Sequence, residues 1–284
     1  MRLVTFREGN QDRIGARSGD SIVDLSAGDS TIPSNMRSFL EAGDSVCRAA
    51  ESVIKAGGPS YSPDDVKILA PITNPEKLIC IGLNYADHAA ESGMDIPSEP
   101  IVFSKYASTI IGPGDTIRLP PSSNEPDYEV ELVVVIGKSG FNISESEAMG
   151  YVAGYTVGHD VSARDYQLKK PGGQWMLGKT FDTFAPIGPD LVTADEIADP
   201  HNLPIRCILN GETVQDSNTK QLIFKVPELV AYLSHVFTLS PGDLIFTGTP
   251  PGVGMARNPQ LWLKAGDHVA CEVDGIGRLE NSVA

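Results

Sequence analysis

The sequence predicts a mixed α+β protein rich in β-strands, with a small N-terminal α+β domain over residues 1–70 and a larger domain over residues 71–284. Short strand-like runs bounded by glycine and proline dominate the chain from Lys77 onward. Helical spacing is confined to a few segments. The stretch GPSYSPDDVKILAPITNPEK is rich in proline and serine, as expected of a linker between the two parts.

The first seventy residues contain two strand-like runs and one helical pattern. RLVTFREG and DSIVDLSAG predict strands separated by turn residues. MRSFLEAGDSVCRAAESVIKAG has apolar residues at helical spacing and ends at the pair Gly57-Gly58, which predicts a helix that stops there.

Two further helices are expected within the strand-rich region. The run from Ser144 to Glu147 has the form of a capping box and predicts a helix start. VPELVAYLSHVF has Pro227 in its first turn and an apolar face, which indicates a helix packed on the core. That face comprises Val226, Leu229, Val230, Leu233, Val236 and Phe237.

Charge and composition narrow the function. The chain has 22 Lys and Arg against 37 Asp and Glu, a formal charge of −15, which argues against nucleic acid as a partner. A small acidic substrate remains compatible, because charges beyond roughly 8 Å are screened at physiological salt. No apolar run approaches the length of a membrane span, and the N-terminus lacks the apolar stretch of a secretory signal, so a cytoplasmic protein without membrane contact is expected.

The four cysteines, Cys47, Cys80, Cys207 and Cys271, are scattered and form no C-x-x-C pair. This spacing excludes zinc ribbons and dithiol redox motifs. Their apolar neighbourhoods predict free, buried thiols.

The stretch YEVELVVVIG, Tyr128 to Gly137, predicts a strand whose apolar continuation suggests burial on both faces. Glu129 and Glu131 are two residues apart and therefore share one face. Burial and mutual repulsion penalise two such carboxylates. Either this is an exposed edge strand with charged gatekeepers, or a cation sits between the two side chains.

Asp160 favours the cation. VAGYTVGHDVSARDYQ predicts a strand from Val152 to Val157, and Asp160 follows its end, where a side chain can point into a cleft. Together with Glu129 and Glu131 it forms an all-oxygen ligand set. Such a set favours Mg²⁺, Mn²⁺ or Ca²⁺ over zinc.

Three other segments carry candidate polar groups. In IGLNYADHAAESG, His88 and Glu91 share a face if the segment is a short helix, and a glutamate can orient a histidine as a general base, although a solvated surface pair has the same spacing. Lys179 lies near Phe181 and Phe184, either as a surface lysine or as a partner for an anionic oxygen. FTGTPPGVG lacks a phosphate-loop lysine, and it is either a hairpin loop or a carboxylate-binding loop.

Five segments in order, GLNYADHAAESG, DYEVELVVVIG, GHDVSARDYQ, GKTFDTFAPIGP and GDLIFTGTPPGVG, resemble the fumarylacetoacetate hydrolase family. The resemblance covers roughly Lys77 to Ala284. It implies a mixed, largely antiparallel β-roll around a divalent cation, and a homodimer. The N-terminal part is similar to the small β-rich unit of longer bacterial members.

The resemblance also implies roles for individual residues. Glu129, Glu131 and Asp160 match the metal carboxylates, and Lys179 matches the active-site lysine. His88 and Glu91 match the catalytic dyad on a lid segment. Arg164 and Gln167 match the polar substrate-binding residues after the metal aspartate, and Thr249 lies in the loop that matches the one holding the substrate carboxylate. Ile81, Gly82 and Leu83 stand where fumarylacetoacetate hydrolases proper have another metal aspartate. This departure favours the branch of acylpyruvases and 2-hydroxyhepta-2,4-diene-1,7-dioate isomerases.

The expected function is hydrolysis of a carbon–carbon bond in a 2,4-dioxo acid through a metal-bound enolate. Mg²⁺ or Mn²⁺ is the expected cofactor, with Ca²⁺ as a substitute, and the lid is expected to close over substrate. Oxaloacetate decarboxylation, or isomerisation and tautomerisation of a 2-oxo dienedioate, is the alternative on the same site. A calcium-binding recognition module is the non-enzymatic alternative, and it would not need His88, Glu91 or Lys179.

Overall fold

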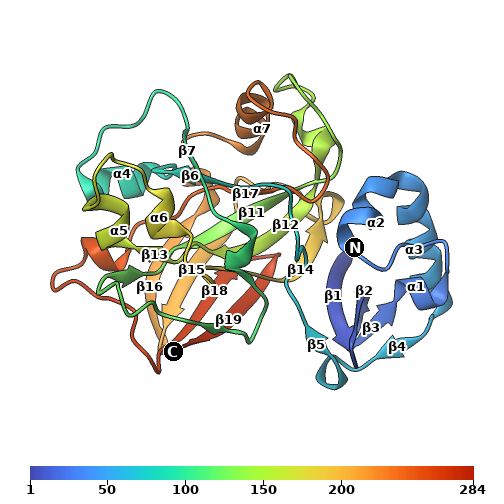
Figure 1. Ribbon diagram of the computed structural model, residues 1–284. Coiled ribbons are helices and arrows are strands. Elements are labelled where there is room, and N and C mark those ends of the chain that lie inside the picture. Colours follow the sequence, from blue (N-terminus) through green and yellow to red (C-terminus); the bar gives the residue numbers. More distant parts are fainter.

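The computed structural model describes residues 1–284, apart from the side chain of Ser92 (Figure 1). A twelve-stranded mixed sheet runs through the molecule in the order β4-β3-β2-β1-β14-β12-β11-β17-β6-β7, with β5 paired to β1 and β8 to β14. Its strands are β1 Arg2–Glu8, β2 Gln11–Ser18, β3 Ser21–Asp24, β4 Ser60–Tyr61, β5 Lys67–Ile68, β6 Leu78–Gly82, β7 Ile101–Ser104, β8 Ile110–Ile111, β11 Val130–Ile136, β12 Val152–His159, β14 Ala185–Thr193 and β17 Leu244–Phe246.

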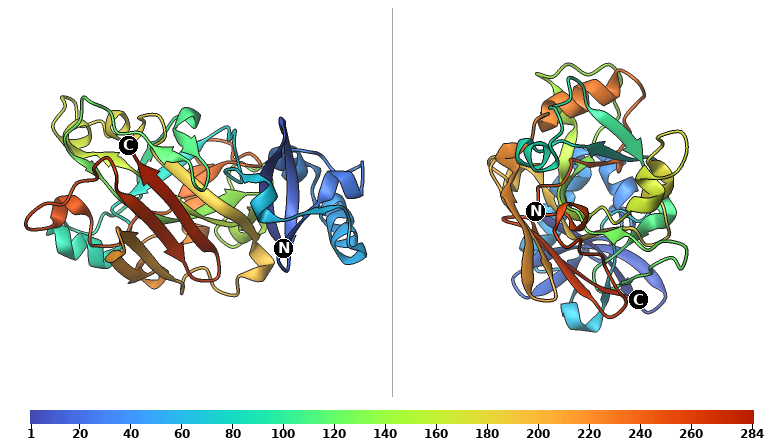
Figure 2. Two further views of the ribbon diagram at one scale, coloured as in Figure 1. Left: turned by 90° about the horizontal axis from the view of Figure 1, so that it is seen from below. Right: turned by 90° about the vertical axis from the view of Figure 1, so that its left-hand side faces the viewer.

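A five-stranded sheet in the order β16-β15-β18-β19-β9 packs against β11 and β12 (Figure 2). Its strands are β9 Thr116–Ile117, β15 Pro204–Leu209, β16 Glu212–Asn218, β18 His268–Val273 and β19 Gly277–Val283, and a separate pair joins β10 Pro126–Asp127 to β13 Ser162–Ala163. The two packed sheets form the strand-rich body that the sequence predicts.

The helices are short. They are α1 Leu25–Gly28, α2 Met36–Ala42, α3 Asp44–Ala56, α4 Ala86–Ser92, α5 Arg164–Leu168, α6 Met176–Lys179 and α7 Val226–Ser234, with 3₁₀ turns at Pro63–Asp65, Ala107–Thr109, Ala148–Tyr151, Ala194–Glu196, Thr219–Gln221 and Gly254–Ala256. None of the helices in the described part of the chain has the length and apolarity to cross a membrane.

Three expectations about helices need correction. The N-terminal helical pattern is two helices, because Gly43 takes a positive φ of 70° between α2 and α3, although the end at Gly57 is as predicted. Ser144 donates a hydrogen bond to Glu147, yet only a 3₁₀ turn follows. Helix α7 ends at Ser234, so Val236 lies beyond it and is 70% exposed.

The N-terminal unit, on the right in Figure 1, joins the rest of the molecule through its first strand. β1 pairs with β14, with Leu3 opposite Leu191, and Leu3 belongs to the same core cluster as Val133 and Leu244. The division into residues 1–70 and 71–284 therefore stays a prediction, because one sheet and one core run across it.

Strand β11 is central, between β12 and β17, and all seven of its residues are buried. Val130, Leu132 and Val134 belong to the core cluster that includes the five-stranded sheet, whereas Val133 and Val135 belong to the cluster shared with the N-terminal unit. The exposed edge strand considered for this segment is therefore wrong. A core on both faces explains its continuous apolar run.

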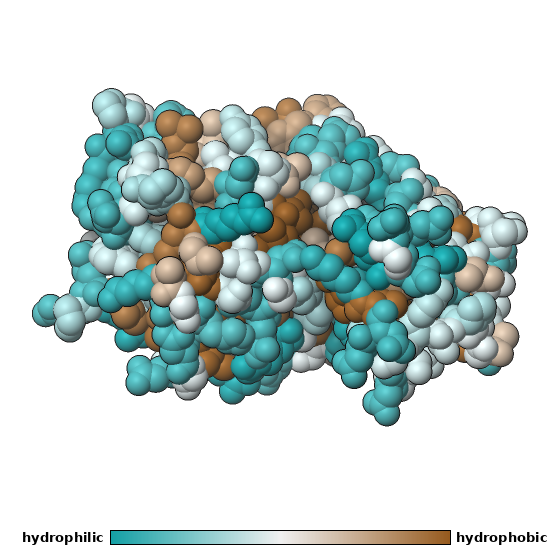
Figure 3. All heavy atoms as spheres, turned by 60° about the horizontal axis from the view of Figure 1, so that its bottom comes forward, coloured by the Kyte–Doolittle hydropathy of each residue, from teal (hydrophilic) through white to brown (hydrophobic). Residues whose placement is uncertain are grey.

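The surface on the face drawn in Figure 3 is largely hydrophilic, with apolar groups mostly in its recesses. This is the surface expected of a chain with an excess of acidic residues. The acidic residues that matter for chemistry are not on it, because they are buried at one end of β11.

Candidate active site

The antiparallel pairing of β11 with β12 brings three carboxylates together. Val130 lies opposite His159, so Glu129 at the start of one strand meets Asp160 at the end of the other. The Asp160 N–H donates to the Glu129 carbonyl over 2.9 Å. Oxygen atoms of Glu129, Glu131 and Asp160 lie within 4.8 Å of one another, and all three residues are buried. The grouping predicted from the sequence is present.

Two lysines pair with this cluster. The Lys179 Nζ lies 2.7 Å from Glu129 Oε2 and 2.9 Å from Asp160 Oδ2. The Lys105 Nζ pairs with the other oxygen of Asp160 and donates to the Val161 carbonyl over 3.0 Å. Lys179 is only 2% exposed, so the surface-lysine interpretation is wrong. Its ammonium group also lies 5.0 Å from the centre of the Phe103 ring.

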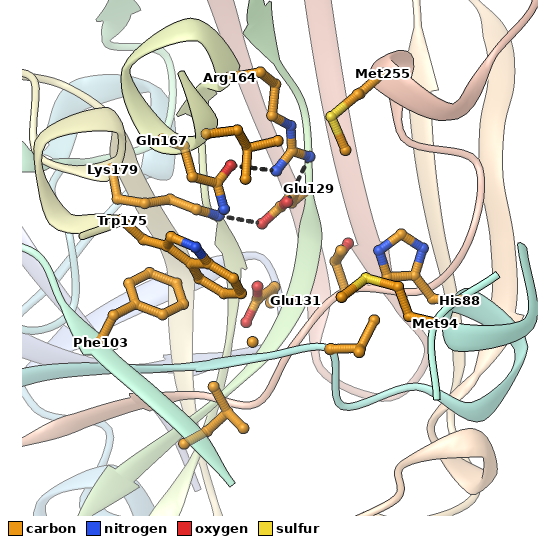
Figure 4. Close-up of a pocket in the computed structure, with 15 residues that line it drawn as sticks. His88, Met94, Phe103, Glu129, Glu131, Arg164, Gln167, Trp175, Lys179 and Met255 are labelled. Carbon is orange, nitrogen blue, oxygen red and sulfur yellow. Dashed lines mark hydrogen bonds and ion pairs between the residues drawn. The ribbon is translucent and has the colours of Figure 1, made fainter. Parts of the chain in front are cut away.

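Helix α5 supplies the polar groups on the other side of Glu129 (Figure 4). Arg164 forms ion pairs with Asp127 at 2.8 Å and with Glu129 at 2.6 Å. Its Nη1 donates to Gln167 Oε1 over 2.8 Å, one helical turn further on. Arg164 and Gln167 are therefore both at the carboxylate cluster, although in this arrangement the guanidinium group is bound to protein carboxylates.

The charges of the cluster do not balance. Burial opposes ionisation of Glu129, but Lys179 and Arg164 outweigh it and lower its pKa to about 2. For Glu131, burial together with Asp160 and Glu129 raises the pKa well above its usual value. Within the part of the chain that the structure describes, its partner is the Gly248 N–H at 2.7 Å rather than a lysine or arginine.

A divalent cation fits this donor set. Four buried carboxylates, Asp127, Glu129, Glu131 and Asp160, face three buried cations, Lys105, Arg164 and Lys179. The carboxylate left over is that of Glu131, and oxygen ligands are those that Mg²⁺ and Mn²⁺ prefer. Binding such an ion would leave the cluster with one net positive charge, which suits an anionic substrate.

The dyad predicted on the lid segment has the expected geometry. Helix α4 follows β6, and Gly93, directly after its last residue, caps it with a left-handed backbone. The His88 Nδ1 lies 3.1 Å from Glu91 Oε2, and the same carboxylate accepts a hydrogen bond from the Gly252 N–H. His88 is therefore oriented by a residue that is itself held by the loop after β17.

His88 of the dyad and, from the cluster, Glu129, Glu131 and Lys179 line one cavity of about 140 Å³ (Figure 4). One part of its wall is charged and the other is apolar, with Phe103 and Trp175 packed edge to face. The lining residues are Ile81, Gly82, Leu83, His88, Met94, Phe103, Glu129, Glu131, Arg164, Gln167, Leu168, Trp175, Lys179, Thr249 and Met255. The volume is below the roughly 300 Å³ at which pockets for drug-sized ligands begin, which favours a small ligand.

Thr249 lies in the loop after β17, on the cavity wall. Its Oγ1 donates to the Val130 carbonyl over 2.9 Å and accepts a hydrogen bond from the Gln215 side chain over 2.9 Å. The residue is 6% exposed. The loop is therefore tied to the strand that carries the two glutamates.

Sequence reasoning missed Lys105, Asp127 and Gln215. Asp127 continues the alternation of Glu129 and Glu131 along the chain, and that period could have found it. Lys105 directly follows a strand, as Asp160 does. The sequence around Gln215 gives no comparable signal.

A family model described as the C-terminal domain of fumarylacetoacetate hydrolase matches residues 77–284. The chain belongs to the fumarylacetoacetate hydrolase family. The matched region holds every carboxylate, lysine and histidine of the site described above, and the mixed, sheet-rich architecture agrees with it.

Two relatives of this family member are named as mitochondrial oxaloacetate tautomerases. The Xenopus laevis protein is 54% identical and the Homo sapiens protein 50% identical, each over the whole chain and over 90% and 91% of its own length. A solved structure of maleylpyruvate hydrolase from Sphingobium sp., in complex with manganese(II) and pyruvate, is 30% identical with a TM-score of 0.84, covering 100% of this chain and 99% of that one.

These relatives correct two expectations. A cytoplasmic location is contradicted, since relatives at 50–54% identity are named as mitochondrial. Enzymatic function agrees with the family, but the names of these relatives favour the tautomerase alternative over the hydrolase that was expected first.

Proposed function

We propose that this protein is a tautomerase that interconverts the keto and enol forms of oxaloacetate. The observation that carries the proposal is His88, oriented by Glu91, on the wall of a small cavity that the buried Glu129, Glu131 and Lys179 also line. The tautomerase names of two relatives at 50% and 54% identity support the choice of oxaloacetate.

The chemistry requires moving one proton between C3 and the oxygen on C2. We assign the Nδ1 proton of His88 to the bond with Glu91, which leaves Nε2 free of a proton and able to accept one. His88 would take the C3 proton of the keto form and return it, as the imidazolium, to the C2 oxygen of the enolate. A positioned base of this kind typically contributes about 10²–10⁴-fold in rate.

Positive groups would hold the dianion and its developing charge. Burial opposes the ammonium form of Lys179, but Asp160 and Glu129 outweigh it and raise its pKa, so the group stays charged. Two of its three N–H donors are used by carboxylates, and the third is available to an oxygen of the substrate. Arg164, Gln167 and Thr249 would fix the rest of the molecule.

Glu129, Glu131 and Asp160 would hold Mg²⁺ or Mn²⁺, with Ca²⁺ as a substitute, and the ion would act as a Lewis acid that lowers the cost of the enolate charge. The raised pKa of Glu131, caused by burial and by the neighbouring Asp160 and Glu129 carboxylates, supports this assignment, because a cation there would relieve that repulsion. The name of the maleylpyruvate hydrolase structure, which includes manganese(II) and pyruvate, supports the choice of a divalent ion and a 2-oxo acid.

The test follows the ultraviolet absorbance of enol oxaloacetate after dilution into buffer with Mg²⁺. Protein should accelerate the decay of the signal beyond that caused by Mg²⁺ alone, and chelation of the metal should abolish the effect. Decay at the same rate with and without protein, at several Mg²⁺ and Mn²⁺ concentrations, would rule out the tautomerase.

Hydrolysis of an acylpyruvate is the second candidate, because the same dyad can take a proton from water instead of from carbon. Release of pyruvate from acetylpyruvate, measured beside oxaloacetate tautomerisation on one preparation, separates the two. A turnover number for acetylpyruvate that exceeds that for oxaloacetate would make the hydrolase the better assignment.

A further inference from the structure

Gln215 is a buried polar residue that no step described so far uses. It lies on β16 in the five-stranded sheet and is 1% exposed. Its Oε1 accepts from the Val130 N–H over 2.9 Å, and its Nε2 donates to Thr249 Oγ1 over 2.9 Å and to the Pro250 carbonyl over 2.8 Å. Both amide hydrogens and the amide oxygen are therefore in use.

These hydrogen bonds take the place of strand pairing beside β11, at the point where β17 no longer runs along it. β17 pairs with β11 at Val133, Val134 and Val135, and its chain then turns away. Val130 would lose its backbone partners on that side, which is costly in a buried strand. Instead, Thr249 Oγ1 donates to the Val130 carbonyl, and Gln215 Oε1 accepts from the Val130 N–H. Because Gln215 also donates to Thr249, the three residues form a closed ring of hydrogen bonds.

The departure of the chain after β17 places two backbone groups at the site. The Gly248 N–H reaches Glu131, and the Gly252 N–H reaches Glu91. Gly248 has a φ of +101°, and a Cβ there would lie 2.8 Å from the Cβ of Asn84, so the turn depends on glycine. Gln215 is the side chain that ties this loop to the metal-binding strand from a different sheet.

We propose that Gln215 is a positioning residue for substrate binding: it fixes Thr249, whose hydroxyl proton is already donated to Val130, so that the backbone of the loop forms a preformed binding site for a substrate carboxylate. The inference rests on the assignment of Thr249 to that carboxylate in the proposed function. It does not depend on which reaction follows, because the ring of hydrogen bonds precedes any chemistry.

Two variants separate the contribution of the amide oxygen of Gln215 from that of its amide N–H donors. Gln215→Met removes both the oxygen and the N–H donors while keeping a side chain of similar volume. Gln215→Glu keeps an oxygen for the Val130 N–H and loses the amide donors, and it keeps the test open if the methionine variant does not fold. The probe is oxalate, a dianion that mimics the enolate of pyruvate, titrated by calorimetry into Mn²⁺-loaded protein.

Both variants should bind oxalate about tenfold more weakly, as expected for loss of a bond that orders the binding site of a charged ligand. In oxaloacetate turnover, KM should rise by a similar factor while kcat changes by less than about threefold. Mn²⁺ affinity should stay within about twofold of wild type in Gln215→Glu, because the hydrogen bond to Val130 remains. If Gln215 had a purely structural role, the variants would lose thermal stability, but KM would not rise selectively over kcat and oxalate affinity would not fall while Mn²⁺ affinity is kept.

The deciding measurement is a cycle with Thr249→Val. If Gln215 acts through Thr249, Gln215→Met should weaken oxalate binding in the wild type and have little further effect in the Thr249→Val background. Leu209→Ala is the matched control, since Leu209 is buried on the neighbouring strand β15, next to the β15–β16 turn, and its apolar side chain forms no hydrogen bond. It should lose stability and keep wild-type oxalate affinity.

Oxalate affinity of Gln215→Met within about twofold of wild type, additive losses in the cycle, or the same loss in Leu209→Ala would each overturn the positioning role. A wild-type protein that does not bind oxalate would remove the carboxylate-binding site, and this inference with it. A wild-type protein that binds oxalate but does not tautomerise oxaloacetate would overturn the proposed function alone.

Discussion

Glu91 bridges His88 and the backbone of Gly252: its Oε2 lies 3.1 Å from the His88 ring nitrogen, and its oxygens accept the Gly252 N–H over 3.0 and 3.1 Å. Helix α4 and the loop after β17 are thus joined through one carboxylate. The orientation of the imidazole depends on a contact outside its own helix.

The first prediction concerns this bridge. His88→Ala should lower the rate of oxaloacetate tautomerisation by roughly 10²-fold or more, because the proton acceptor is lost. Glu91→Gln should lower it less, since a glutamine keeps the ring in place but stabilises the imidazolium poorly. Rates come from the enol absorbance assay.

Both variants should bind Mn²⁺ and oxalate with wild-type affinity, because neither residue belongs to the carboxylate cluster. Wild-type rates in His88→Ala would exclude the dyad as the base. A parallel loss of Mn²⁺ binding would place His88 at the metal instead.

The second prediction concerns Glu131, whose carboxylate is buried without a lysine or arginine partner among the described residues. Glu131→Gln should abolish the Mg²⁺-induced rise in melting temperature. The metal-free variant should be at least as stable as the metal-free wild type, because it lacks a buried carboxyl group whose ionisation burial, Asp160 and Glu129 oppose. Differential scanning calorimetry with and without Mg²⁺ measures both effects.

Glu228→Gln is the control, since Glu228 lies in the first turn of α7, in a segment apart from the cluster. It should keep the full Mg²⁺ response. An unchanged Mg²⁺ response in Glu131→Gln would contradict the assignment of this residue to the metal.

The site residues that can be predicted from the sequence are those whose spacing matches the repeat of a strand or a helix. Two residues along a strand share a face, which identifies Glu129 and Glu131, and three along a helix share a face, which identifies His88 and Glu91. Asp160 is identified because it follows the end of a strand. Each of these rules uses neighbours in the chain, and the structure places each residue where its rule puts it.

The parts that were missed depend on the order of strands in space. Lys105 contacts Asp160, and Gln215 contacts Thr249, only because the fold brings together segments that are far apart in the chain, and the spacing of residues along the sequence does not predict such contacts. The pairing of β1 with β14 is a contact of the same kind. The helix predicted from the capping box at Ser144 is also wrong, because only a 3₁₀ turn follows it.

A homodimer is the third prediction. The family resemblance implies it, and β7 and α6, which lie in contact, form a region with exposed apolar side chains: Val102 on β7 is 41% exposed, Tyr106 just after β7 is 56% exposed, and Leu177 on α6 is 56% exposed. Such a patch is commonly covered by a second copy. Light scattering should give twice the chain mass of 30.3 kDa.

Tyr106→Asp should shift that mass toward the monomer by burying a charge in the interface. Met149→Asp, at an exposed apolar residue near the N-terminal helices, should leave it unchanged. A wild-type mass of a single chain across the working concentration range would contradict the dimer.

The last prediction concerns Lys105, which sequence reasoning missed. Burial lowers the pKa of this lysine and Asp160 opposes that shift, so the ammonium group depends on its partner. Lys105→Met would leave Asp160 with Lys179 as its cationic partner. Removing one member of a buried charge pair costs up to about 3–5 kcal/mol, and the remaining lysine should keep the loss near the lower end. Urea denaturation of metal-free protein measures it.

Saturating Mn²⁺ should restore much of that stability, because the ion supplies the positive charge that Asp160 has lost. Mn²⁺ should also bind more tightly to Lys105→Met than to the wild type, since an ammonium group no longer competes for the same carboxylate. Lys55→Met, at the end of α3, is the control and should change stability by less than about 0.5 kcal/mol. Equal losses in both variants, or a loss in Lys105→Met that Mn²⁺ leaves unchanged, would show that Lys105 and the metal do not share Asp160.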